Sequence, residues 1–289
     1  MEFIQTKTIL SKLKKSPEPW FGITYNMNLY RGCQHQCIYC DSRSKCYQID
    51  DFSKIQVKEN ALYLLENEIK RKKQKGTIGT GSMNDPYMPL EKTSKMVRGA
   101  LEIIAKNKYP VHIITKSNLV LRDIDLIKNI SETYAAVSLT ITTYDDELSK
   151  IIEPGAPTTS ERFAALKELS DNGIYCGVLL MPVLPFINDT VENITNIIEK
   201  TALNGGKYII GWMGMTLRDN QRDYYYKALD KYFPGISESY KSRYKEQYSV
   251  SVPDSLVLQN TFNSTCKKFN LPTKMEFFSE SKPEQLSLF

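Results

Sequence analysis

The chain has 289 residues, of which 41% are hydrophobic and 25% charged, and its formal net charge is +5 at pH 7. These values are typical of a globular α/β barrel with an extension, and the absence of a run of about 18 apolar residues excludes a membrane-spanning helix. No apolar core precedes a small-residue cleavage site near the amino terminus, so we expect a cytoplasmic protein. The mildly positive charge permits an acidic partner such as nucleic acid without requiring one.

Short β-rich segments alternate with helical segments from residue 23 onwards. The expected strands are residues 23–30, 77–80, 111–115, 135–141, 174–181 and 207–213. The expected helices are residues 59–73, 94–106, 122–130, 160–172 and 190–203. Six β-then-α units with apolar strands predict a parallel sheet with right-handed crossovers, as a partial barrel or as an open doubly wound sheet. In either fold the functional site lies at the carboxyl ends of the strands.

The pattern changes after about residue 218. Residues 219–248 are polar, helical in character and rich in tyrosine, and a further helix is expected at 254–268. We favour an amphipathic helix that closes the barrel for the tyrosine-rich segment, with stacking on nucleic-acid bases as the alternative. The predicted organisation is an amino-terminal arm (1–19), a barrel (20–218), a helical extension (219–278) and a flexible tail (279–289).

The lysines are scattered along the chain rather than gathered in one motif. The densest run of basic residues, 70–75, reads KRKKQK and ends a helix-like stretch. Cations are favoured at the carboxyl end of a helix. We therefore interpret this run as a solvated helix end, with contact to phosphate as the alternative.

Three of the six cysteines, Cys33, Cys37 and Cys40, form a C-x3-C-x2-C motif just after the first expected strand. Clustered cysteines in a long chain without a signal peptide indicate a metal site in a reducing cytosol. Thiolates suit iron–sulfur clusters and zinc, and three of them would leave one iron of a cluster free for another ligand. The alternative is a zinc-stabilised nucleic-acid-binding protein, with His35 or Cys46 as the fourth ligand.

The motif and its context resemble the radical SAM superfamily. The segments that carry the resemblance are YRGCQHQCIYC, GTGSMNDPYMPLE, ITKSNLVLRD, SLTITTYDDELSKIIEPGAPTTSERFAAL and MPVLPFIND, in that order. Their order is similar to that of the spore photoproduct lyase-like branch, also called DNA repair photolyase-like proteins. The resemblance implies a partial (β/α)6 radical SAM barrel and a [4Fe–4S] cluster. It also implies cleavage of S-adenosyl-L-methionine to a 5′-deoxyadenosyl radical.

The resemblance also implies roles for individual residues. The three motif cysteines would be the cluster ligands, and Tyr39 would line the adenine side of the cofactor. Ser82 and Asn84 stand where many relatives carry a Gly-Gly-Glu-type motif for the methionine amino group. The alternative for this stretch is an ordinary turn before proline. Lys116 and Ser138 occupy positions that contact the methionine carboxylate in relatives.

The sequence departs from spore photoproduct lyases in one segment. Those enzymes use a cysteine there to return hydrogen to the product, and residues 79–91 contain none. Repair of spore photoproduct by that route is therefore not expected. Cys176 and Cys266 are interpreted as buried apolar residues. Cys46 is the better candidate for a second redox role.

Two charged residues lie beside the motifs. Arg31 precedes the cysteines in YRGC, and Glu153 stands in IIEPGAP. Either residue is a candidate for positioning substrate or cofactor, and the alternative is a structural ion pair inside the barrel. His112 is interpreted as a strand residue without a further role.

The last five residues, Gln285-Leu286-Ser287-Leu288-Phe289, resemble the peptide by which bacterial proteins bind the sliding clamp. Apolar anchors on a mobile segment suit a surface groove; the alternative is a tail that packs on its own barrel. The function we expect is a bacterial radical SAM enzyme acting on a DNA lesion, with a reducing partner such as flavodoxin or ferredoxin. The alternative substrates are RNA, a peptide or a small molecule.

Overall fold

The computed structural model describes residues 2–49 and 51–280. Its centre is a seven-stranded sheet with the order β10-β9-β8-β7-β6-β3-β2. The strands are β2 (Leu10–Lys12), β3 (Ile23–Met27), β6 (Thr77–Gly79), β7 (Val111–Thr115), β8 (Ala135–Thr140), β9 (Tyr175–Leu180) and β10 (Ile209–Gly211). All neighbouring pairs are parallel except β2 with β3. In the described part of the chain β10 and β2 do not pair with each other, and the six parallel strands with their helices agree with the predicted partial barrel.

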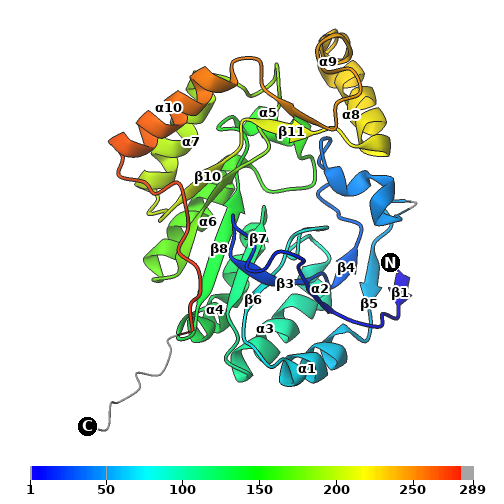
Figure 1. Ribbon diagram of the computed structural model, residues 1–289, viewed down its shortest axis with the longest axis vertical. Helices are drawn as coiled ribbons and strands as arrows, with labels where there is room; N and C mark the ends of the chain where they lie inside the picture. Colours follow the sequence, from blue (N-terminus) through cyan, green and yellow to red (C-terminus); the bar gives the residue numbers. More distant parts are fainter. Residues whose placement is uncertain (1, 50, 281–289) are drawn as a thin grey trace.

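Helices follow the strands and cover the outer face of the sheet (Figure 1). They are α1 (Ala61–Arg71), α2 (Glu91–Ser94), α3 (Met96–Lys106), α4 (Ile124–Ser131), α5 (Asp146–Ile152), α6 (Thr159–Asp171) and α7 (Val191–Leu203). The apolar faces of the longer helices pack in the core against the sheet, as Val97, Leu101 and Ile104 of α3 do. No helix in the described part of the chain is long and apolar enough to cross a membrane.

The first expected strand, residues 23–30, is divided in two. β3 ends at Met27, and β4 (Tyr30–Arg31) joins a second sheet with β5 (Gln56–Lys58) and β1 (Glu2–Ile4) in the order β1-β5-β4. The cysteine motif therefore lies in the loop between two strands of the small sheet. That arrangement fixes both ends of the loop beside the main barrel.

The described carboxyl-terminal part, residues 214–280, contains three helices and a strand pair. They are β11 (Gly214–Thr216), α8 (Asp219–Tyr232), α9 (Ile236–Tyr244), β12 (Ser249–Ser251) and α10 (Ser255–Lys268). β12 pairs antiparallel with β11, and α10 packs along α7 at the edge of the barrel (Figure 1). In the tyrosine-rich segment Tyr225, Tyr240 and Tyr244 are buried, with ring centroids 5.4 and 5.5 Å apart in successive pairs. These three tyrosines thus form core contacts, as the helical interpretation requires.

Candidate active site

A cavity of about 260 Å³ opens at the carboxyl ends of the parallel strands. The carboxyl end of each of the six parallel strands, or the loop that follows it, contributes lining residues. They are Cys33, His35, Cys37, Tyr39, Cys40, Asp41, Ser42, Gly81, Ser82, Met83, Asn84, Asp85, Ile114, Thr115, Lys116, Thr140, Met181, Pro182, Trp212, Met215 and Thr216. The cavity therefore lies where parallel α/β folds place their sites.

The three motif cysteines all face this cavity. Cys33 and Cys37 are buried, Cys40 is half-buried, and none of them forms a disulfide. Gly32 begins the loop with φ of +79°, where an added Cβ would approach the carbonyl oxygens of Phe52 and Lys54 at 2.9 and 3.0 Å. This conformation favours glycine and directs the chain into the cavity.

The loop after α5 holds the cysteine loop in place. The N–H of Ile38 donates to the carbonyl of Ile152 at 2.9 Å, and the N–H of Gly155 donates to the carbonyl of His35 at 3.0 Å. A Cβ on Gly155 would collide with the carbonyl oxygen of Gln34. The motif IIEPGAP thus supplies a close backbone contact for which only glycine leaves room.

A buried ion pair lies behind Tyr39. The Tyr39 hydroxyl donates to the carboxylate of Glu153, and Nη1 of Arg162 lies 2.5 Å from the other carboxylate oxygen. Both members of the pair are fully buried. Burial alone would raise the pKa of Glu153, but Arg162 and Lys116 outweigh it and lower the pKa. Glu153 therefore stays ionised and positions Tyr39.

Arg31 does not take part in that pair. Its guanidinium donates to the carbonyls of Tyr47 and Gln48 at 3.3 and 2.5 Å. The hypothesis of an Arg31–Glu153 pair was therefore wrong, because Glu153 pairs with Arg162 of α6 instead. The two residues are nine positions apart, and the sequence analysis did not identify Arg162 as the partner.

The loop after β6 is fixed by two polar side chains. Nδ2 of Asn84 donates to the carbonyl of Tyr30 at 2.7 Å. Asp85 accepts from the hydroxyl of Thr115 and the N–H of Lys116, both at 2.6 Å, and lies 3.4 Å from Nδ1 of His35. Burial opposes the charge of Asp85, but His35 and these hydrogen bonds outweigh it and lower its pKa to about 2. Asp85, which the sequence interpretation passed over, ties three loops of the cavity together.

Lys116 contributes a cation to the cavity wall. Its Nζ lies 5.7 Å from the centroid of the Tyr39 ring. Burial lowers the pKa of a lysine, but the neighbouring Cys37 and Glu153 outweigh that effect and raise it. The side chain is therefore a fixed positive charge beside the thiols.

Ser82 also lines the cavity, where its hydroxyl bonds to the amide of Asn28.

Ser138 does not line the cavity. Its hydroxyl is fully buried between Nε2 of His112 at 2.7 Å and the hydroxyl of Tyr208 at 2.8 Å. In this structure the predicted contact of Ser138 with a cofactor carboxylate is not available, because the side chain lies in a deeper layer of the barrel.

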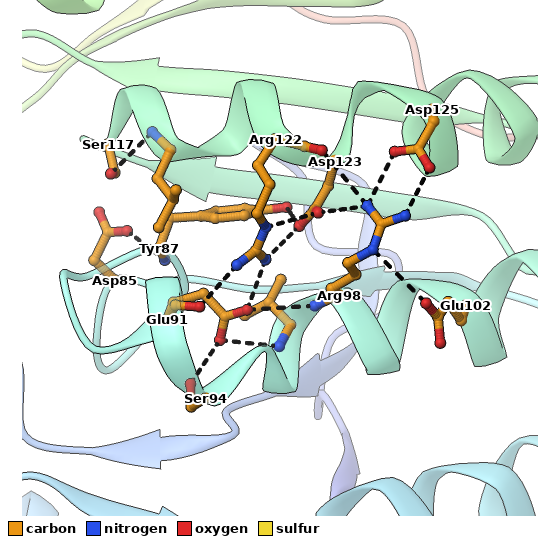
Figure 2. Close-up of polar contacts among 12 residues, drawn as sticks. Asp85, Tyr87, Glu91, Ser94, Arg98, Glu102, Ser117, Arg122, Asp123 and Asp125 are labelled. Atoms are coloured by element: carbon orange, nitrogen blue, oxygen red, sulfur yellow. Dashed lines mark hydrogen bonds and ion pairs between the residues drawn. The ribbon is translucent and has the colours of Figure 1, made fainter.

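A network of charged residues supports the loops after β6 and β7. Figure 2 shows Arg122 between the carboxylates of Glu91 and Asp123, with Nη2–O distances of 2.7 Å to each. The carboxylate of Asp123, which is fully buried, also accepts from Tyr87 at 3.1 Å and from Arg98 at 2.9 Å. Each buried carboxylate is thus paired, as its burial requires. The network joins the start of α3 to the turn before α4, directly below the cavity loops.

The sequence interpretation missed the residues that the last strands contribute. Trp212 follows β10, and Met215 and Thr216 belong to β11. All three line the cavity because the chain after β10 runs along its edge. Cys46, the candidate for a second redox role, is exposed and does not line the cavity. Cys176 and Cys266 are buried.

The donor set fits an iron–sulfur cluster. Burial raises the pKa of Cys33 to about 12 and also raises the pKa values of Cys37 and Cys40, so the thiols hold their protons until a metal displaces them. Among the described residues no three His, Cys, Asp or Glu side chains converge as ligands of one metal ion. The cysteines of a cluster each bind a different iron, and three thiols that surround one cavity are compatible with that requirement.

Comparison with known proteins places the chain in a family. The radical SAM superfamily model matches residues 27–216. An uncharacterized protein of Methanocaldococcus jannaschii is 39% identical over 189 residues, which are 64% of this chain and 70% of that protein. A radical SAM Nα-GlyT isomerase of Pseudomonas phage M6 is 25% identical over 178 residues, 62% of this chain and 36% of the phage protein.

Among solved structures, spore photoproduct lyase complexed with dinucleoside spore photoproduct superposes with a TM-score of 0.68 and 15% identity. The superposition covers 92% of this chain and 78% of the lyase. The predicted resemblance to that branch is thereby confirmed for the fold. With the six-unit barrel, the cysteine loop and the family match together, the chain belongs to the radical SAM superfamily.

Proposed function

We propose that the protein binds a [4Fe–4S] cluster through Cys33, Cys37 and Cys40 and cleaves S-adenosyl-L-methionine to begin a radical reaction. The observation that carries the proposal is the convergence of three free thiols on one cavity with Lys116 in its wall. Superfamily membership supports the iron–sulfur interpretation over zinc. When bound, the two cofactors supply one-electron chemistry and the 5′-deoxyadenosyl radical.

The residues of the chain bind and orient the cofactor. Lys116 neutralises the methionine carboxylate as a point charge, and Ser82 and Asn84 offer hydrogen-bonding groups from the loop after β6. The Asn84 amide already donates to the backbone, so its carbonyl oxygen is the atom left for an amino group. Tyr39, held by Glu153, provides the flat wall on the adenine side.

For the substrate we propose damaged DNA. The support is the fold shared with a lyase whose solved complex holds a dinucleoside lesion. Cys46 does not line the cavity, and residues 79–91 lack a cysteine, so no cysteine of these two places is proposed as the hydrogen donor. RNA, a peptide or a small molecule is the alternative substrate.

Anaerobic purification tests the cofactor proposal. We expect a brown protein with about four irons per chain that releases 5′-deoxyadenosine when dithionite and S-adenosyl-L-methionine are added. Cys37→Ala should lose both the colour and the release, whereas Cys46→Ser should keep them. A colourless protein with one zinc that stays inert after reconstitution would support the zinc alternative instead. Deuterium transfer from damaged oligonucleotides to 5′-deoxyadenosine would identify the substrate class.

The proposed partners are a reductant, such as flavodoxin or ferredoxin, and the sliding clamp, and the proposed location is the cytoplasm. The clamp peptide Gln285, Leu286, Leu288 and Phe289 lies outside the described residues. Binding of the full chain to the clamp should be lost in Leu288→Ala and Phe289→Ala. Equal affinity of these variants would remove the clamp from the proposal without touching the radical chemistry.

A further inference from the structure

Eight basic residues gather at the amino-terminal ends of β3, β6 and β7, on the side of the barrel opposite the cavity. We call them the lysine face: Lys12, Lys14, Lys15, Arg71, Lys72, Lys73, Lys75 and Lys108. Seven are exposed and Lys72 is half-buried. The whole chain carries +5, so the rest of the chain carries a net −3. These eight cations come from three segments that are separate in the sequence, where the lysines are scattered.

The fold brings three separate segments together to form the lysine face. β2 runs antiparallel to β3, and the N–H of Leu13 donates to Thr24 at 3.0 Å, which carries residues 13–15 towards the start of β3. A Cβ on Gly76 would approach the Thr24 side chain at 2.6 Å, so the segment before β6 lies beside them. Ile78 in turn bonds to Pro110, which adds the segment before β7.

Aromatic rings hold the middle segment in place. The Tyr25 hydroxyl donates to the carbonyl of Gln74 at 3.2 Å, and Nζ of Lys72 lies 4.9 Å from the Tyr25 ring centroid. Nζ of Lys75 likewise lies over the Tyr109 ring, 5.9 Å from its centroid. Cations fixed over rings in this manner are pre-positioned, so little further ordering is needed when an anion binds.

The cations of the lysine face lack carboxylate partners. Within residues 2–49 and 51–280 none of them forms an ion pair, whereas lysines elsewhere, such as Lys150, Lys167 and Lys241, pair with a neighbouring carboxylate. The adjacent Glu68 carboxylate accepts from the N–H groups of Ile9 and Leu10, each at 2.9 Å, and contributes one negative charge beside the face. Glu280 lies near Tyr109 at the edge and contributes one negative charge. The surplus positive charge is left for an external anion.

We propose that the lysine face binds the phosphate backbone of duplex DNA. Four neighbouring strands about 4.8 Å apart give it a width of about 14 Å. A duplex carries one phosphate charge per about 1.7 Å of its axis, or about eight over that width, and the phosphates on its facing side are the ones that the lysine face can contact. Surface-bound membrane proteins combine cations with exposed apolar residues, but in these segments Leu10, Tyr109 and Pro110 are buried and Leu13 is half-buried. The proposal goes beyond the proposed function, because this surface lies away from the cavity and needs no radical chemistry.

Salt-dependent binding of the reconstituted full chain to an undamaged labelled duplex tests the proposal. The variant Lys14→Gln/Lys15→Gln/Lys73→Gln should lower the slope of log K against log salt by roughly 2.7 and weaken binding at low salt on the order of a hundredfold. The control Lys150→Gln/Lys167→Gln/Lys241→Gln removes the same charge from paired lysines and should bind like the wild type.

Two results would overturn the proposal. One is an equal loss of affinity in both triple variants, because that would reflect net charge alone. The other is unchanged DNA binding in the lysine-face variant. If binding of this variant to anionic lipid vesicles falls while its DNA binding does not, the face binds a membrane surface and the proposal is likewise wrong. Release of 5′-deoxyadenosine should be normal in both variants. If the wild type releases none, the proposed function fails while the DNA-binding result still stands.

Discussion

At the scale of single residues, the cavity divides into two kinds of wall. The cysteine loop and the loops after β6 and β7 supply thiols and charges, whereas the loops after β9 and β10 supply Met181, Pro182 and Trp212. A polar cofactor would occupy the first part, and an apolar or flat group would face the second. Trp212 is therefore the residue best placed to report what enters the cavity.

The two tryptophans of the chain make that placement measurable. Trp212 lines the cavity, whereas Trp20 is 46% exposed and lies outside it. In Trp20→Phe, reconstitution of the cluster should quench most of the remaining fluorescence, because energy transfer from Trp212 to an absorbing cluster falls steeply with distance. The reciprocal variant Trp212→Phe should be quenched less. Equal quenching in the two variants would contradict the placement of the cluster beside Trp212.

At the scale of elements, the cysteine loop depends on the segment after α5. Glu153 has its partner Arg162 on α6 and holds Tyr39 of the cysteine loop. Removal of one member of a buried pair leaves an uncompensated charge, at a cost of about 3–5 kcal/mol. The integrity of the cofactor site is thus coupled to the packing of α6 on the barrel.

Glu153→Gln should therefore lower the free energy of unfolding by about 3–5 kcal/mol, measured by urea denaturation of the protein without cluster. The matched control is Glu147→Gln, which breaks an exposed pair with Lys150 and should cost less than about 1 kcal/mol. A similar small effect in both variants would show that Arg162 finds another partner.

At the scale of the whole molecule, stability depends on a histidine that the barrel keeps neutral. Burial lowers the pKa of His112 to about 4, from about 6.5 in an unfolded chain. Between these pH values the unfolded state binds more protons, so the stability of the fold falls as the pH falls from 6.5 to 4. By pH 5 this single group should remove about 2 kcal/mol of stability.

His112→Gln should abolish that part of the pH dependence. The measurement is the difference in unfolding free energy between pH 7 and pH 5, which should be about 2 kcal/mol smaller in the variant than in the wild type. The absolute stability of the variant at pH 7 is a separate quantity, since Gln also changes the bond to Ser138. An unchanged difference would mean that His112 is protonated in the folded state.

The sequence by itself determined the six β/α units, the cysteine motif and the family, because these depend on local periodicity and on residues close together in the chain. It also pointed to Tyr39, Ser82, Asn84 and Lys116 as site residues, and all four line one cavity. Parallel strands end at a common edge, so the residues that follow them lie close together. Only the tertiary structure decided that Ser138 faces His112 and that Arg162 rather than Arg31 meets Glu153.

The gathering of the lysine face was likewise decided by the tertiary structure, through the pairing of β2 with β3 and of β6 with β7. These outcomes depend on strand register and on how separate elements pack, including two elements joined by a short turn, as α5 and α6 are. A change of one position in a strand turns a side chain to the opposite face, and no local pattern in the sequence records which distant partner it then meets.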